Sequence, residues 1–166
     1  TLFDGSPTRY KDFVHDYGDK NTQLLATVGW QRDRRDSLSY PTQGGYQRLD
    51  FNASLPGSNL KFYRLEYQQQ HFFPLSKVFT LMLNGELDYG GGYGGQPLPF
   101  FQNFQAGGEG SVRGFKTSSL GVKDANGDAL GGNKRLLFSG ELLFPLPNKE
   151  DDKSLRLSVF LDAGTV

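Results

Sequence analysis

Apolar and polar residues alternate along six stretches of this sequence, a pattern that predicts β-strands with one apolar and one polar face. The predicted strands span residues 21–32, 46–55, 61–73, 78–89, 135–144 and 155–166. The alternation is clearest at 78–89, where Leu81, Leu83 and Leu87 alternate with polar residues such as Asn84 and Glu86. The sequence contains no run that approaches the roughly 18 consecutive apolar residues of a membrane-spanning helix. The pattern therefore predicts an all-β chain of antiparallel strands.

The two faces of these strands differ enough to indicate which one contacts lipid. We expect the apolar set to point outward: Leu49, Phe51, Leu65, Phe79, Leu81, Leu83, Leu136, Leu142, Leu157 and Val159. We expect the polar set to point into a lumen: Asp50, Arg64, Glu66, Glu86, Glu141 and Asp162. Alternation alone does not distinguish a face covered by lipid from one covered by a second sheet, so a soluble β-sandwich stays open as an alternative.

The connections between the predicted strands differ in length at the two ends of the sheet. Turns at about 33–45, 74–77 and 145–153 share one end, while a turn at 56–59 and a glycine-rich stretch from 90 to about 133 share the other. Loops as long as this stretch are usually functional or disordered. Short turns at one end and long loops at the other are typical of outer-membrane β-barrels, with the turn at 56–59 as an exception.

Composition narrows the chemistry that the chain can carry. Among its 166 residues are 22 Gly, 14 Phe and 8 Tyr, which fits an aromatic-rich β protein. The 18 basic and 18 acidic residues cancel, so there is no electrostatic basis for binding nucleic acid. Cysteine is absent, which excludes disulfides, thiol catalysis and Cys–zinc sites. The first residues carry no signal-peptide pattern and look like an internal cut of a longer protein.

Other site motifs are incomplete in this sequence. The stretch Gly107-Gly108-Glu109-Gly110 lacks the Lys-Ser/Thr that follows in a phosphate-binding loop. Residues 124–128 resemble half of a calcium loop, but Arg135 stands where the Glu at the twelfth position would be, so we expect a polar turn there. His15 and His71 are isolated, and no nucleophile elbow is present. We therefore predict no catalytic residue, no metal and no cofactor.

Six short motifs carry a resemblance to a known family. They are Tyr40-Pro41-Thr42-x-Gly44, Pro56-Gly57-Ser58, Pro99-Phe100-x-x-Asn103-Phe104, Val112-Arg113-Gly114-Phe115, Gly131-Gly132-Asn133 and Asp162-x-Gly164-Thr165-Val166. In their order and spacing they resemble the BamA family, the central barrels of the outer-membrane protein assembly machinery. The resemblance runs from about residue 21 to 166 and implies an antiparallel transmembrane β-barrel, present here only in part. Residues 1–20 would then be the remnant of an extracellular loop, and the POTRA domains and the final strands would lie outside this chain.

The resemblance also implies a site. In the BamA family the long loop folds back into the lumen, and the Arg of its Val-Arg-Gly-Phe/Tyr tip pairs with acidic residues on the two following strands. In this sequence the tip is Val112, Arg113, Gly114 and Phe115, within the loop at 90–133, and the carboxylates are Glu141 and Asp162. The strand pattern supports this independently, because both carboxylates fall on the predicted inward face. A buried guanidinium needs hydrogen-bonded carboxylates of this kind.

The function implied by the resemblance is not enzymatic. It implies a factor that folds and inserts nascent β-barrel proteins into the bacterial outer membrane, with the lipid bilayer around it and accessory lipoproteins bound through the POTRA domains. The alternatives are a two-partner secretion transporter or a TamA protein of the same superfamily, a passive porin, and the soluble sandwich. Six strands are fewer than the eight or so of the smallest usual barrel, so we predict that the strands at 21–32 and 155–166 do not pair with each other.

Overall fold

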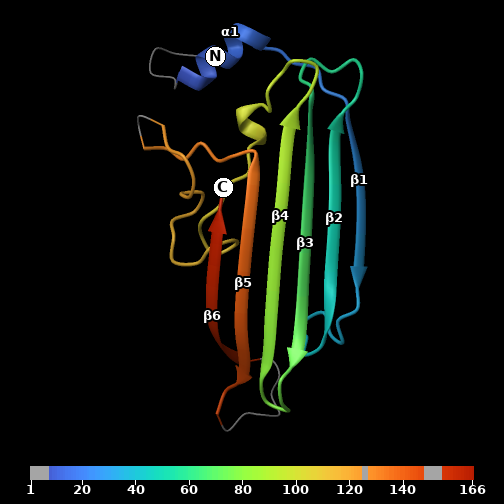
Figure 1. Ribbon diagram of the computed structural model, residues 1–166, viewed down its shortest axis with the longest axis vertical. Coiled ribbons are helices and arrows are strands. Elements are labelled where there is room, and N and C mark those ends of the chain that lie inside the picture. Colours follow the sequence, from blue (N-terminus) through green and yellow to red (C-terminus); the bar gives the residue numbers. More distant parts are fainter. Residues whose placement is uncertain (1–7, 125–126, 148–154) are drawn as a thin grey trace.

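A single antiparallel sheet of six strands, ordered in space as in the chain, forms the body of the molecule (Figure 1). The computed structural model describes residues 8–124, 127–147 and 155–166. The strands are β1 (Leu25–Asp33), β2 (Gly44–Ser54), β3 (Phe62–Pro74), β4 (Thr80–Gly92), β5 (Lys134–Pro145) and β6 (Arg156–Thr165). The predicted antiparallel β architecture is confirmed, with one added helix, and each predicted strand is present with shifted ends.

Hydrogen bonds outside the ladder explain the main shifts of the strand ends. Strand β1 begins at Leu25 because the residue before it binds the next turn, where the Leu24 N–H donates to Ser58 Oγ at 3.0 Å. Strand β4 instead runs further than predicted, since Gly90 and Gly92 still pair with β3. Part of the glycine-rich stretch is therefore strand, and the long loop begins at residue 93. The predicted turn at 145–153 falls mostly outside the described residues.

The cross-strand register places the predicted apolar and polar sets on opposite faces of the sheet. Leu65 lies opposite Phe51, whereas the next residue, Glu66, lies opposite Asp50. The same alternation continues from β3 to β6. Within the described part of the chain no second sheet covers the apolar face, where Val28 is 68% exposed. An apolar face of this extent is suited to contact with lipid, as in a barrel.

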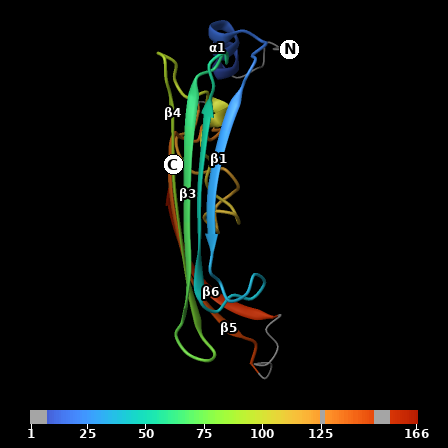
Figure 2. The same ribbon diagram turned by 90° about the vertical axis from the view of Figure 1, so that its right-hand side faces the viewer.

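The two outer strands, β1 and β6, lie at opposite edges of the sheet, and no ladder joins them in the described residues, as predicted. The sheet is curved, and the long loop lies on its concave face (Figure 2). At the short-turn end, the curvature brings the turn at 34–43 to the base of β6. There Arg156 donates hydrogen bonds to the carbonyl oxygens of Tyr40 and Pro41, both at 2.9 Å.

The helix α1 (Thr8–Tyr17) is not among the predicted elements. It packs on the short 3-10 helix η1 (Phe100–Gln102), where the ring centroid of Phe13 lies 5.8 Å from that of Phe100 and 5.4 Å from that of Phe101. These edge-to-face contacts connect residues 8–17 to the start of the long loop. Neither helix in the described part of the chain is long and apolar enough to cross a membrane.

Candidate functional site

The long loop between β4 and β5 turns back on itself near its middle. Gly107 and Gly108 have positive φ angles of 109° and 94°, a conformation that favours glycine. A Cβ on Gly107 would lie 2.5 Å from the carbonyl oxygen of Lys116, so the two arms of the loop pass too closely for a side chain there. The Gly107 N–H donates to Ser111 Oγ at 2.8 Å and the Gly108 N–H to the Val112 carbonyl at 3.1 Å. The tip is therefore a compact turn.

At this tip, Arg113 reaches the inner face of β6. Its Nε donates to Asp162 Oδ2 at 2.7 Å and its Nη2 to Asp162 Oδ1 at 2.8 Å, so one edge of the guanidinium binds both carboxylate oxygens. The backbone N–H of Arg113 also donates to Asp162 Oδ2, at 3.0 Å. Ser139 on β5 completes the contact, since its Oγ accepts from Arg113 at 3.0 Å and donates to Asp162 at 2.7 Å.

Two further groups surround the Arg113 guanidinium. Glu141 Oε2 lies 3.5 Å from Arg113 Nη1, and the centre of the Phe160 ring lies 3.6 Å from the guanidinium carbon. The Asp162 side chain is only 3% exposed, whereas that of Arg113 is 24% exposed. Hydrogen bonding to Asp162 raises the pKa of Arg113, although partial burial opposes this. The site therefore joins one partly exposed cation to two largely buried carboxylates.

Val112, next to Arg113, anchors the tip by packing. It is 3% exposed and belongs to a small core with Ala106 and Leu137. Gly164 on β6 makes room for this core, because a Cβ there would lie 2.8 Å from Val112 Cγ2 and 2.6 Å from Leu137 Cδ2. The other two motif residues contribute less packing: Gly114 supplies a φ of 88°, and Phe115 is 54% exposed.

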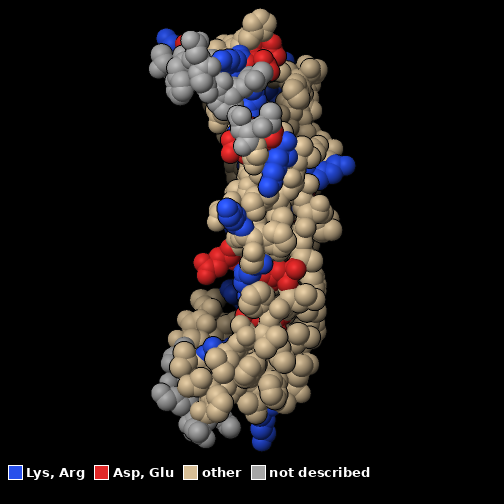
Figure 3. Space-filling model, turned by 90° about the vertical axis from the view of Figure 1, so that its left-hand side faces the viewer, with Lys and Arg blue, Asp and Glu red and all other residues tan. Residues whose placement is uncertain are grey.

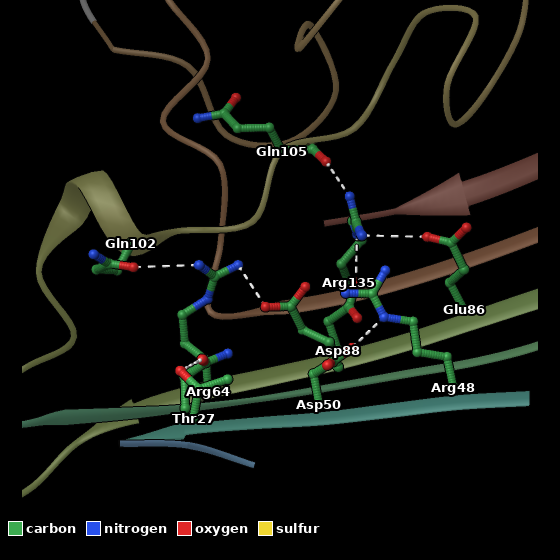
Figure 4. A network of polar contacts seen from close by, with 11 residues as sticks. Thr27, Arg48, Asp50, Arg64, Glu86, Asp88, Gln102, Gln105 and Arg135 are labelled. Carbon is green, nitrogen blue, oxygen red and sulfur yellow. Dashed lines mark hydrogen bonds and ion pairs between the residues drawn. The ribbon is translucent and has the colours of Figure 1, made fainter. Parts of the chain in front are cut away.

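A second group of contacts holds the loop nearer its base, and we call it the stem network (Figure 4). It comprises Arg64, Glu86, Asp88, Gln102, Phe104, Gln105 and Arg135. Arg135 donates to Asp88 Oδ2 at 2.5 Å, to Glu86 Oε2 at 3.2 Å and to the Gln105 carbonyl at 3.0 Å. Asp88 is 4% exposed as a residue, so its charge depends on this partner.

Arg64 makes the second half of the stem network. Its Nη1 donates to Gln102 Oε1 at 3.2 Å, and its guanidinium carbon lies 4.4 Å from the centre of the Phe104 ring. Arg64, Glu66 and Glu86 were predicted to point into the lumen, whereas Arg135 was given no role in a site. The alternation of β5 places Arg135 on the inward face, and this pattern could have indicated a lumen role for it from the sequence.

Between the loop tip and the wall lies a polar cavity of about 290 Å³. Its lining includes Gln68, Asn84, Glu86 and Glu109 as well as the Arg113 site. Acidic and basic side chains gather at mid-height on the side of the molecule shown in Figure 3. In the described residues no group of three or more potential ligands could hold a metal ion. The arrangement is suited to holding the loop in place.

Together the curved sheet, with its apolar outer and charged inner face, and the loop on its concave side define part of an outer-membrane β-barrel with a loop in its lumen. The chain belongs to the Omp85 superfamily, since the model of the Omp85 superfamily domain matches residues 1–166. This family result agrees with the resemblance found in the sequence.

Comparison with known proteins gives closer relatives. The chain is 44% identical over 177 residues to the outer membrane protein assembly factor BamA of Neisseria meningitidis, covering 99% of this chain and 22% of that protein. It is 34% identical to a SAM50-like protein of Schizosaccharomyces pombe, over 89% of this chain and 32% of that protein. The crystal structure of Haemophilus ducreyi BamA lacking POTRA domains 1–3 matches with a TM-score of 0.85 and 28% identity, over 99% of this chain and 36% of that one. The chain thus corresponds to a BamA barrel region, and it spans about a fifth of the length of the Neisseria protein.

Proposed function

We propose that the protein containing this chain folds and inserts β-barrel proteins into the bacterial outer membrane. The observation that carries this proposal is the 44% identity to a BamA assembly factor along 99% of the chain. On the same basis we propose nascent β-barrel proteins as its substrates and accessory lipoproteins, bound through POTRA domains, as its partners. The chain itself would supply part of the barrel wall and the lumen loop, without a cofactor or nucleotide.

Within this function, we assign Arg113 the role of holding the loop inside the barrel. The guanidinium contacts β5 through Ser139 and Glu141 and β6 through Asp162, so one side chain joins the loop tip to two strands of the wall. The stem network holds the same loop a second time at its base. A loop fixed at two points can keep its shape while other parts of the barrel move.

Secretion by a two-partner transporter or a TamA protein is the second candidate, because such proteins belong to the same superfamily. The names of the relatives favour assembly: one is an outer membrane protein assembly factor, and another is a subunit of the sorting assembly machinery of Saccharomyces cerevisiae. A passive porin would differ in showing high and steady ion conductance. We therefore place assembly first.

The test replaces Arg113 with Ala in the complete protein, in cells that depend on it for assembly. We expect Arg113→Ala to give lower levels of folded outer-membrane proteins and a less heat-resistant barrel. The effect of Arg113→Lys should lie between that of Arg113→Ala and the wild type. Lys116→Ala is the matched control, since Lys116 is an exposed cation in the same loop. Normal assembly of a reporter barrel by Arg113→Ala, at normal protein levels, would show that the contact has no part in the function.

A further inference from the structure

One part of the outward face is polar. At the short-turn end of β1, β2 and β3, a notch of about 200 Å³ is lined by Arg32, Arg34, Gly45, Gln47, Gln69 and His71. The register places all of these residues except Arg34, which follows the end of β1, on the lipid-facing side of the sheet. Arg32 lies opposite Gln47, which is two residues before the outward Leu49 and so shares its face. His71 lies opposite the outward Leu83. The notch is therefore outside the lumen, next to the apolar rows.

Both arginines of the notch lack a protein counterion. Arg32 and Arg34 make no side-chain hydrogen bond or ion pair with any residue in the described ranges. The inward arginines differ, because Arg64, Arg113 and Arg135 each pair with a carboxylate.

The acidic residues of the adjoining turn are already engaged. Asp33 binds the Arg35 guanidinium, and Asp36 accepts hydrogen bonds from Thr42. Two positive charges at the edge of the apolar face therefore remain available to an anion from outside the chain.

The local backbone shapes this notch. Gly44 has a φ of 94°, and a Cβ on it would lie 2.0 Å from the Arg34 carbonyl oxygen, so only glycine lets Arg34 approach β2 this closely. The Arg34 N–H in turn donates to the Gly45 carbonyl at 2.8 Å. A Cβ on Gly45 would meet His71 Nδ1 at 2.8 Å, so the absence of a side chain lets the imidazole lie over the β2 backbone.

The amide groups of the notch are also oriented. Gln69 Oε1 accepts hydrogen bonds from Gln47 Nε2 at 2.6 Å and from the Tyr67 hydroxyl at 3.0 Å. With its oxygen engaged twice, Gln69 keeps its NH₂ group as a donor. The notch thus combines two guanidinium groups and an amide donor, a set of groups that matches the oxygens of a phosphate.

We propose that this notch binds the phosphate group of an anionic phospholipid at the short-turn rim of the barrel. The acyl chains of the lipid would lie along the adjoining apolar rows, where Trp30 and Leu49 pair on the same face and are 50% and 37% exposed. A guanidinium at the rim of an apolar band is well placed for a lipid headgroup, because the phosphates of a bilayer lie at that level. This proposal does not depend on the assembly function.

The experiment uses the complete protein, purified in detergent and stripped of lipid, with bound lipid counted by native mass spectrometry. The probes are phosphatidylglycerol, phosphatidylcholine and inorganic phosphate. Arg32→Gln and Arg34→Gln are each expected to weaken retention of phosphatidylglycerol about fivefold, and the double variant roughly 30-fold, from about 1 kcal/mol for each basic residue near anionic lipid. Lys77→Gln is the matched control, because Lys77 is an exposed cation in the β3–β4 turn at the same end of the sheet.

The expected result is the loss of one retained phosphatidylglycerol per chain in the double variant, with weaker retention of phosphatidylcholine by the wild type and no change in Lys77→Gln. All variants are expected to keep a heat-resistant folded form, because neither arginine makes a side-chain hydrogen bond or ion pair in the described ranges. Equal retention by the wild type and the double variant would overturn the proposal. An equal loss in Lys77→Gln would also overturn it, because the lipid would then respond to nonspecific positive charge. Displacement of the lipid by inorganic phosphate at equal concentration would overturn it as well, because the notch would then be a site for small anions.

Discussion

Arg113 and Asp162, 49 positions apart in the sequence, are joined through both the side chain and the backbone of the arginine. The guanidinium donates to both carboxylate oxygens at 2.7 and 2.8 Å, and the Arg113 N–H donates to Oδ2 at 3.0 Å. The carboxylate therefore fixes the position of the loop backbone as well as the charge of the side chain. Because of this, a lysine at 113 could keep the charge and the backbone bond but would lose the two-pronged contact.

A double-mutant cycle on this pair is the first prediction. Arg113→Ala leaves Asp162, whose side chain is 3% exposed, without its cation. We expect a loss of about 3 kcal/mol in barrel stability, at the low end for broken buried pairs because Arg113 is partly exposed. Asp162→Asn should cost a similar amount, and the double variant much less than the sum. The measurement is the temperature at which the compact folded form disappears, read by electrophoresis of samples incubated at a series of temperatures. Strictly additive losses in the two single variants and the double variant would contradict direct coupling between the two residues.

Gly164 provides a second test of how the loop tip is seated. A Cβ at this position would overlap Val112 and Leu137, so Gly164→Ala should push the tip off β6. We expect a loss of about 1–3 kcal/mol, the range for overpacked cores, and faster protease cleavage of the loop. Gly110→Ala is the control in the same loop, because a Cβ there meets nothing within 4 Å. Equal effects of the two substitutions would show that the close approach at Gly164 is unimportant.

The stem network gives a third prediction. Arg135→Gln removes the cation beside Asp88 and Glu86 and the hydrogen bond to the loop backbone at Gln105. Since the Asp88 side chain is 3% exposed, we expect a loss of about 3 kcal/mol. Arg48→Gln is the control: this arginine also pairs with a lumen carboxylate, but its side chain is 55% exposed, so the loss should be about 0–1 kcal/mol. The same gel assay compares Arg135→Gln with Arg48→Gln. Equal losses of stability in the two variants would show that the stem network does not hold the loop.

The strands and their faces could be predicted because a period of two residues is visible in a single sequence. Glu66 and Leu65 fall on opposite faces whatever the register of the neighbouring strands. The strand ends could not be predicted in this way. The start of β1 depends on a hydrogen bond from Leu24 to the Ser58 side chain, which no local pattern indicates.

The candidate site was predicted only in part from the residues themselves. The alternation placed Glu141 and Asp162 inward, but the choice of Arg113 as their partner came from the family resemblance. Ser139 and Phe160, which also contact Arg113, were not predicted, because a serine and an aromatic ring on an inward face carry no distinctive pattern. Residues separated by a loop of about forty positions have no register that a single sequence can provide.

A fourth prediction concerns the turn at 34–43, outside the strands. Asp36 accepts hydrogen bonds from the backbone N–H groups of Thr42 and Gln43 at 2.8 and 3.2 Å and from the Thr42 hydroxyl. Desolvation raises the pKa of Asp36, but these bonds outweigh it and lower the pKa to about 2. The turn is therefore stabilised in full above the ordinary carboxyl pKa of 3.8, and the contribution is lost as the pH falls through about 2.

The measurement for this turn is protease cleavage of the complete protein at a series of pH values. Asp36→Asn should make the turn as susceptible at pH 7 as the wild type is at the lowest pH, because the amide cannot accept all three bonds as a carboxylate does. Asp124→Asn is the control, since that carboxylate lies in the long loop, outside this turn, and accepts a hydrogen bond from the Asp128 N–H. A wild-type turn that opens at pH 4 would contradict the lowered pKa.

The last prediction concerns which face of the barrel meets lipid. Leu83 and Asn84 are neighbours on β4, where Leu83 lies opposite Gly140 and Asn84 lies opposite Ser139, next to the Arg113 site. Because the chain contains no cysteine, single cysteines at these two positions can carry a fluorophore once any cysteines elsewhere in the complete protein are removed. A label at Leu83 should be quenched by nitroxide-bearing acyl chains, and one at Asn84 should not. A shift of one residue in the register would exchange the faces of the whole strand, so quenching at Asn84 alone would refute both the face assignment and the lumen position of the carboxylates that bind Arg113.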